Sequence, residues 1–145
     1  MKISTRGRYA LRTMVDLAQH GGSGLVTLKD VAARQDLSQK YLEQIVTQLS
    51  KAGLVKGVRG PQGGYRLSRE AKDYNVGEIL ELVEGSLAPV ECLEAEVNTC
   101  ERCSSCPSLD MWAGLYKVVT DYLGNITLQD LVDRAAATAG NDYVI

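Results

Sequence analysis

The first half of the chain shows three apolar patterns of helical period. Over residues 5–20, apolar side chains return at intervals of three and four, and glycines at 21, 22 and 24 follow, so a helix is expected to end there. Thr27 and Asp30 have the spacing of a capping box and predict a short second helix that ends near residue 37. Ser38 is the expected cap of a third helix, whose apolar face comprises Tyr41, Leu42, Ile45, Val46 and Leu49.

The pattern that follows adds a β-hairpin to these helices. A short helix, a tight turn and a longer helix with a polar outer face are typical of a helix-turn-helix. Residues 54–59 alternate as in a strand, residues 60–64 (GPQGG) are typical of a turn, and residues 65–67 predict a return strand. We therefore predict a winged helix-turn-helix DNA-binding region over residues 1–72, in a fold that is mainly α with a small β-hairpin wing.

The third helix and the wing carry the predicted DNA contacts. Glycines let the backbone of a wing tip approach phosphates closely, and an arginine is favoured in the narrow minor groove. The predicted contact residues are Ser38, Gln39, Lys40, Tyr41, Glu43 and Gln44 on the helix, and Arg59, Gly60, Gln62, Gly63, Gly64 and Tyr65 in the wing. Because a carboxylate can accept a hydrogen bond from a cytosine amine, Glu43→Ala is expected to broaden the choice of DNA site.

Residues 73–145 are predicted to form a second region, with a cysteine-loop sensor and a dimerisation helix. Asn75 and Glu78 have capping-box spacing, and Gly85 ends that helix. The acidic segment that follows has no apolar period and is predicted to be a loop. Ser108 is the expected cap of a long helix that runs to about residue 123. Thr127 and Asp130 predict a last short helix, and the tail from residue 135 is expected to fray.

The apolar face of the long helix is wider than packing on one small domain requires. Positions 111, 115, 118 and 122 form a heptad-like seam beside a second seam at 112, 115, 119 and 123. A core helix is the alternative interpretation. We predict a homodimer in which two-fold pairing presents two recognition helices to a palindromic operator. The predicted dimerisation residues are Met111, Trp112, Leu115, Val118, Val119 and Tyr122.

Charge separates the two regions. The net charge of −2 is the sum of +8 over residues 1–72 (13 Lys/Arg, 5 Asp/Glu) and −10 over residues 73–145 (3 Lys/Arg, 13 Asp/Glu). A basic half beside an acidic half indicates a polyanion-binding module and a module that avoids polyanions. With one histidine and no phosphate-binding loop motif, we expect no catalytic site, hence no enzyme. The absence of an apolar run long enough to span a bilayer predicts a cytoplasmic protein without membrane contact.

All four cysteines lie within fifteen residues, with the spacing Cys92-x7-Cys100-x2-Cys103-x2-Cys106. In the cytosol such clusters favour a metal site or a redox sensor over a structural disulfide. Thiolates suit iron–sulfur clusters. All four thiolates could also bind one Zn²⁺, but structural zinc sites commonly pair one Cys-x2-Cys with a second, a spacing that this segment does not have. A thiol switch is also open, although the nearby glutamates are expected to raise the thiol pKa values.

The chain resembles the Rrf2 family of bacterial winged-helix transcription regulators, and within it the IscR-like iron–sulfur regulators. The resemblance covers nearly the whole chain and rests on MKISTRGRYALRTM, on LSQKYLEQIVTQLSKAGLVKGVRGPQGGYRL and on TLQDLVD. It implies an iron–sulfur cluster, 2Fe–2S rather than 4Fe–4S, in the cysteine loop. Cys92, Cys100 and Cys106 match the family's three ligands. The positions of the fourth ligand in known members hold Leu109 and Arg8, neither of which can ligate, so Cys103 is the expected substitute.

These features together predict a DNA-binding repressor of iron–sulfur assembly genes that senses iron–sulfur status. Two alternatives remain open at this point. One is a cluster-free winged-helix regulator that responds to thiol oxidation or to a partner protein. The other is an iron–sulfur electron-transfer protein.

Overall fold

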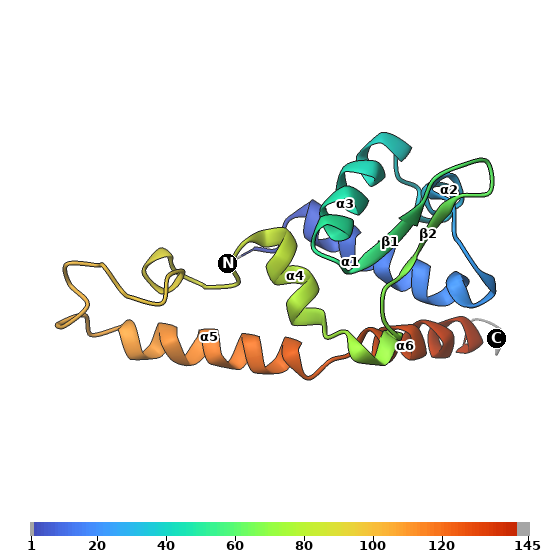
Figure 1. The fold of residues 1–145 in the computed structure, drawn as a ribbon. Coiled ribbons are helices and arrows are strands. Elements are labelled where there is room, and N and C mark those ends of the chain that lie inside the picture. The colour runs from blue at the N-terminus through green and yellow to red at the C-terminus, as the bar shows by residue number, and fades with distance from the viewer. Residues whose placement is uncertain (1, 142–145) are drawn as a thin grey trace.

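The computed structural model describes residues 2–141 and arranges them as a winged-helix unit with a long helix projecting from it (Figure 1). The winged-helix unit comprises α1 (Thr5–His20), α2 (Leu28–Gln35), α3 (Gln39–Lys51), β1 (Val55–Val58) and β2 (Gly64–Leu67). The remaining helices are α4 (Val76–Glu84), α5 (Leu109–Gly124) and α6 (Leu128–Asn141). The predicted fold class is confirmed: helices predominate and the two strands form one antiparallel hairpin.

Side-chain caps begin the helices of the winged-helix unit where the sequence pattern placed them. The hydroxyls of Thr27 and Ser38 accept hydrogen bonds from the backbone N–H groups of Asp30 (3.2 Å) and Tyr41 (3.1 Å). Each cap satisfies a donor that has no partner within its helix. Asn75 begins α4 with a complete capping box to Glu78. These local bonds explain why the starts of three helices could be predicted within one or two residues.

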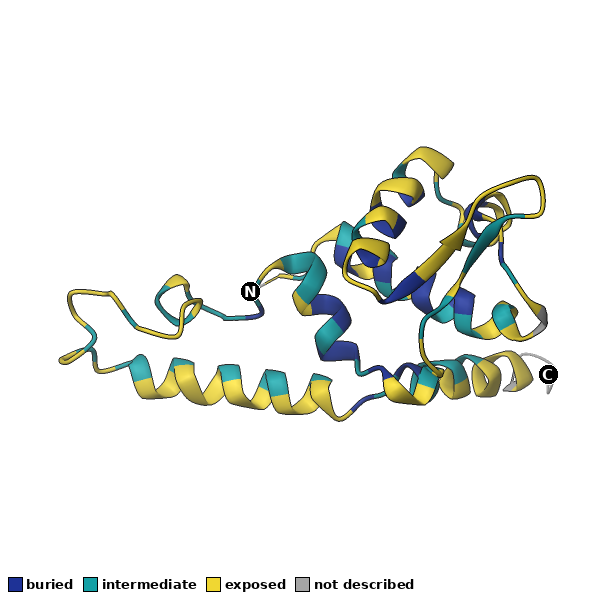
Figure 2. Cartoon of the chain, viewed as in Figure 1, coloured by how far each residue is buried: buried dark blue, intermediate teal, exposed yellow. Residues whose placement is uncertain are grey.

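The core lies between α1, α2, α3 and the base of the hairpin. Apolar residues from these elements are buried together with Tyr74, Ile79 and Leu128 from the second half of the chain. The structure therefore joins the ranges 1–72 and 73–145 in one core. A smaller apolar cluster of Val76, Leu80, Leu87 and Ile126 joins α4 to the start of α6. The buried residues are concentrated in the winged-helix unit, in α4 and at the start of α6 (Figure 2).

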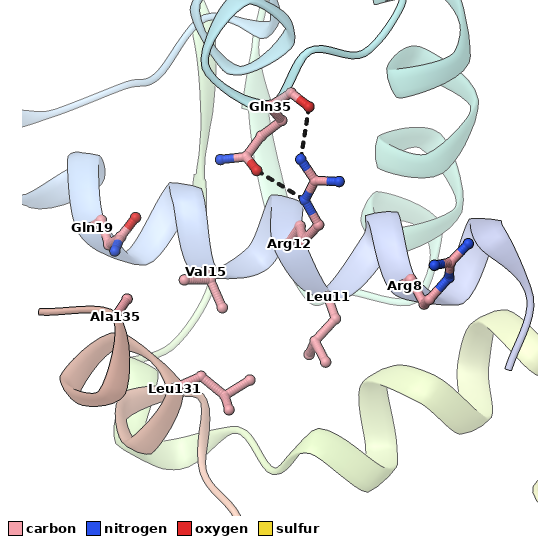
Figure 3. Close-up of a pocket in the computed structure, with 8 residues that line it drawn as sticks. All are labelled: Arg8, Leu11, Arg12, Val15, Gln19, Gln35, Leu131 and Ala135. Carbon is pink, nitrogen blue, oxygen red and sulfur yellow. Dashed lines mark hydrogen bonds between the residues drawn. The ribbon is translucent and has the colours of Figure 1, made fainter. Parts of the chain in front are cut away.

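The last helix is longer than predicted. The tail from residue 135 was expected to fray, but α6 continues to Asn141. Two physical reasons account for the difference: residues 135–137 are alanines, which favour helix, and Ala135 lies with Leu131 on the side of α6 that faces α1 (Figure 3). Residues 142–145 lie outside the described part of the chain.

Candidate DNA interface and cysteine loop

The outer face of α3 carries the polar side chains predicted to read DNA. Lys40, Glu43 and Gln44 are exposed and line one shallow hollow together with Thr47. Thr47 was not among the predicted DNA contacts, although its spacing of seven from Lys40 and four from Glu43 places it on the same face. The four side chains offer a cation, a carboxylate, an amide and a hydroxyl to whatever enters that hollow.

Ser38 and Tyr41 also serve the fold at the start of α3. The Ser38 hydroxyl is the helix cap, which uses one of its acceptor sites and leaves its O–H donor and one further acceptor site free. The ring of Tyr41 is half-buried and meets the ring of Tyr9 edge to face at 6.0 Å. This aromatic pair joins the start of α3 to α1. The predicted DNA contacts of both residues remain predictions.

The hairpin is held in place by a third, short strand segment and by glycines that no larger residue could replace. Val26 and Tyr65 exchange both backbone hydrogen bonds, at 2.9 and 2.8 Å. A β-carbon at position 64 would stand 2.7 Å from the Val26 carbonyl oxygen, which is closer than side chains can approach. At position 63 it would overlap the carbonyl oxygen of Val58. Gly63 and Gly64 are therefore required by the backbone of the wing itself, whatever they contact on DNA.

The hydroxyl of Tyr74 fixes the base of the wing. It accepts hydrogen bonds from the backbone N–H groups of Ser68 (2.9 Å) and Arg69 (3.0 Å), and donates to the carbonyl oxygen of Leu54 at 2.5 Å. The guanidinium of Arg69 lies over the Tyr74 ring, 4.1 Å from its centroid. Both ends of the hairpin are thus tied to one buried side chain.

The wing tip is open to solvent. Arg59, Gly60 and Gln62 are exposed, and Gly60 has a φ of 117°, which only glycine adopts readily. The Gly63 N–H closes the turn onto the Gly60 carbonyl oxygen at 2.9 Å. Arg59 stands beside this turn, as the sequence pattern predicts for a cation that enters a minor groove.

The long helix α5 leaves one side of its surface uncovered. Of the described residues of α5, none is fully buried (Figure 2). Met111, Leu115, Val118 and Tyr122 are exposed, whereas Trp112 and Val119 are half-buried. The two predicted seams share Leu115 and differ elsewhere: the side chains at 111, 118 and 122 are exposed, and those at 112, 119 and 123 are half-buried. A row of exposed apolar side chains of this kind is typical of an interaction surface.

The cysteine loop lies at the end of α5 that is far from the winged helix (Figure 1). Its thiols are free; Cys100 is exposed, and Cys92, Cys103 and Cys106 are half-buried. Cys92 and Cys100 line one hollow together with Glu91 and Thr99. Within residues 2–141, no three His, Cys, Asp or Glu side chains come together closely enough to hold a metal ion. The geometry thus brings two of the four predicted ligands to one hollow and leaves the other two apart.

Cys106 has a neighbour that the sequence analysis misplaced. Ser108 precedes α5 as expected, but its side chain does not cap the helix. Its hydroxyl lies 3.4 Å from the Cys106 sulfur. Hydrogen bonds from the Ser108 hydroxyl and from backbone N–H groups lower the pKa of the Cys106 thiol below its ordinary value. For this cysteine the expected rise in pKa was wrong: hydrogen bonding to the thiolate, helped by the charge of Arg102, outweighs the cost of desolvation.

A groove runs between α1 and α6 (Figure 3). Its floor is apolar, formed by Leu11, Val15 and Leu131, and Arg8 and Arg12 stand along it. Arg12 also donates to the side-chain oxygen of Gln35 at 3.1 Å and to its carbonyl oxygen at 2.7 Å. This arginine therefore connects the groove to the C-terminal end of α2 in the helix-turn-helix.

Comparison with known proteins decides the family. The family model described as "Rrf2: Iron-dependent Transcriptional regulator" matches residues 3–134. The chain belongs to the Rrf2 family of transcriptional regulators. The predicted resemblance is confirmed, as is the expectation that the protein is a DNA-binding regulator rather than an enzyme.

The similar Rrf2 proteins include both IscR and CymR regulators. The HTH-type transcriptional regulator IscR of Pectobacterium atrosepticum is 40% identical over 134 residues, 92% of this chain and 80% of that protein. The structure of T. potens IscR has 41% identity and a TM-score of 0.74, over 93% of this chain and 88% of the other. The structure of CymR, the global cysteine regulator of B. subtilis, has 37% identity and a TM-score of 0.76, over 92% and 98%. Sequence identity and TM-score therefore do not decide whether this chain is of the IscR type or the CymR type.

The Rrf2 chain has no helix in its described part that is long and apolar enough to cross a membrane.

Proposed function

We propose that this Rrf2 protein is a homodimeric repressor that senses iron–sulfur status through a cluster in its cysteine loop. The observation that carries the proposal is the placement of four thiols on one acidic segment, directly before a helix with an exposed apolar seam. In this proposal the winged-helix unit binds DNA, the cysteine loop senses iron–sulfur status, and α5 forms the dimer. The regulated genes would be those of iron–sulfur cluster assembly, as the resemblance to IscR implies.

The donor set fits an iron–sulfur cluster in its chemistry. Cys92, Cys100 and Cys106 would be three ligands and Cys103 the fourth, and thiolate is the usual ligand of such clusters. The loop's hydrogen bonds join residues two or three positions apart, such as Cys103 N–H to the Cys100 carbonyl oxygen at 3.1 Å. A segment held by such local bonds can draw its thiols together without unfolding the core. A bound cluster, 2Fe–2S or 4Fe–4S, would supply a redox-sensitive and iron-dependent centre there.

The proposed dimer forms through α5. Antiparallel two-fold pairing of the seam would bring Met111 opposite the partner's Tyr122 and Leu115 opposite the partner's Val118, and it would bury four side chains that are exposed in one chain. The two α3 helices of such a dimer would read the two halves of a palindromic operator in the major groove, and the two wings would contact the minor groove.

The proposed cofactor is tested by purifying the full-length protein without oxygen. We expect visible absorbance, together with iron and acid-labile sulfide in equal amounts. Alanine variants of each cysteine then test the ligand set: Cys92→Ala, Cys100→Ala and Cys106→Ala should lose iron. Cys103→Ala should also lose iron, and a Cys103→Ala protein with full iron content would place the fourth ligand elsewhere. A colourless wild-type protein would refute the cluster.

A second candidate function is favoured by the contact between Cys106 and Ser108. Because the pKa of Cys106 is lowered, its thiolate is more available for oxidation or alkylation, as a cluster-free thiol sensor would require. The two candidates are distinguished by iron content. A thiol sensor would be iron-free as purified without oxygen, and its DNA affinity would change on treatment with peroxide and recover with a reducing thiol.

A further inference from the structure

The last turn of α4 contacts two helices of the winged-helix unit: α3, which carries the predicted DNA contacts, and α1. The side-chain amide of Gln48, on α3, donates to the carbonyl oxygen of Leu82 at 3.2 Å. That oxygen belongs to the last turn of α4, where helical carbonyls lack partners within their own helix. Helical spacing places Gln48 one turn after Gln44, on the polar face of α3, but the structure turns its amide toward α4.

A second connection joins the same turn to the start of α1. The Glu84 carboxylate accepts hydrogen bonds from the backbone N–H of Ser4 (3.0 Å) and from its hydroxyl (2.7 Å). A negative charge at a helix N-terminus is favoured by the helix dipole. Gly7 makes room for this contact, since a β-carbon at position 7 would overlap the Glu84 carboxylate.

The cysteine loop begins where this turn ends. Gly85 ends α4 with a φ of 84°, and Leu87, only 4% exposed, is anchored among Val76, Leu80 and Ile126. Only four residues lie between Leu87 and Cys92. Any rearrangement that draws Cys92 toward the other thiols therefore pulls on a short segment fixed at Leu87, next to Leu82 and Glu84.

We infer that Gln48 and Glu84 are positioning residues that make the orientation of the recognition helix depend on the state of the cysteine loop. The contacts Gln48–Leu82 and Glu84–Ser4 transmit a displacement of the last turn of α4 to α3 and α1, respectively. This inference rests on the proposed function, because it requires that the loop change state. Neither contact is needed to hold the cofactor or to touch DNA.

The test compares DNA affinity with and without iron in full-length variants. The probe is a DNA duplex selected by the wild-type protein from a randomised pool. Coupling between two sites commonly changes affinity by ~5–150-fold. Gln48→Ala removes the bond to Leu82, and Gly7→Ala displaces Glu84 while favouring the α1 helix. Both variants should bring the affinity ratio between the iron-loaded and iron-free forms to within about twofold of unity, since the coupling is lost.

A matched control and a second readout separate this role from a merely structural one. Gln129→Ala breaks a bond to Asp133 on α6 (2.9 Å) and should keep the wild-type ratio. In wild-type protein, iron removal should change the amide hydrogen exchange of residues 82–87 and of α3 together; in Gln48→Ala it should change only the former. Wild-type ratios in both Gln48→Ala and Gly7→Ala would overturn the inference alone. A wild-type ratio of one would overturn the proposed function, and this inference with it.

Discussion

The guanidinium of Arg34 holds the buried carboxylate of Asp16 with two hydrogen bonds, of 3.0 Å from Nε and 2.8 Å from Nη2. Asp16 is 1% exposed, and the Gln35 side-chain amide adds a third bond at 2.8 Å. The carboxylate lies on α1 and its partners lie on α2, so these bonds fix the first helix of the helix-turn-helix against the core. The three donors replace the water that this carboxylate loses on burial, and removing one side of such a group is costly.

Removal of this carboxylate should destabilise the protein. Asp16→Ala leaves Arg34 and Gln35 without their acceptor, and we expect a loss of about 2–3 kcal/mol in the free energy of unfolding, less than for a fully buried pair because Arg34 can reach water. Urea denaturation measures the loss. Glu70→Ala, which breaks an exposed pair with Lys72, should cost under about 0.5 kcal/mol. Equal losses in the two variants would contradict this role of Asp16.

Loss of the Tyr74 hydroxyl should loosen the wing. Tyr74→Phe keeps the buried ring but leaves the Arg69 N–H without a partner, and it leaves the Ser68 N–H and the Leu54 carbonyl oxygen with only their mutual bond of 3.3 Å. The expected cost is about 1–3 kcal/mol, with faster hydrogen exchange at Ser68 and Arg69. Tyr116→Phe removes a hydroxyl from a tyrosine of α5 that lies outside both seams and serves as control. Unchanged exchange at the wing in Tyr74→Phe would show that the hydroxyl does not hold it.

A charge placed in the exposed seam of α5 should separate the proposed dimer. Val118 is 66% exposed in one chain, and two-fold pairing would bury an introduced aspartate twice. Val118→Asp should weaken association at least ~10–100-fold, about 1.4–2.8 kcal/mol, as measured by sedimentation. Val97→Asp makes the same change in a valine that is 72% exposed and lies off the seam. If both variants associate as wild type does, α5 is not the interface.

Reactivity of Cys106 should depend on Ser108 and on pH. Its hydrogen bonds lower the pKa of the thiol, so in iron-free protein the reactive thiolate persists to lower pH than an ordinary cysteine allows. Ser108→Ala should raise this pKa and slow alkylation of Cys106 by iodoacetamide near pH 7. At a pH well above both pKa values the two proteins should react alike. If Ser108→Ala does not change how the alkylation rate of Cys106 depends on pH, the Ser108 hydroxyl is not the cause of the lowered pKa.

Local sequence signals predicted most of the fold, and the remaining differences arise from tertiary contacts. The caps at Thr27, Ser38 and Asn75 act within one turn, so their spacing alone located three helices. The inward turn of Gln48 depends on a carbonyl oxygen 34 positions away, which periodicity on α3 cannot reveal.

The same distinction applies to the candidate sites. The polar face of α3, with Thr47 on it, follows from helical spacing, and the structure brings Thr47 to the same hollow as Lys40, Glu43 and Gln44. The Ser108 hydroxyl contacts the Cys106 sulfur instead of capping α5. The spacing rule used on the sequence considers Ser108 only as a cap, so it could not reveal this contact. The ligand set of the cysteine loop is still a prediction, because it depends on how the loop closes.

The DNA affinity of the proposed sensor should depend on the state of its cysteine loop. The direct measurement uses one anaerobic preparation of full-length protein and a duplex selected by that protein, with the dissociation constant determined before and after iron is removed by chelation. Iron and sulfide should be present, and their removal should shift the dissociation constant by ~5–150-fold. Identical constants before and after removal, or a colourless protein that binds the duplex with full affinity, would contradict the proposal.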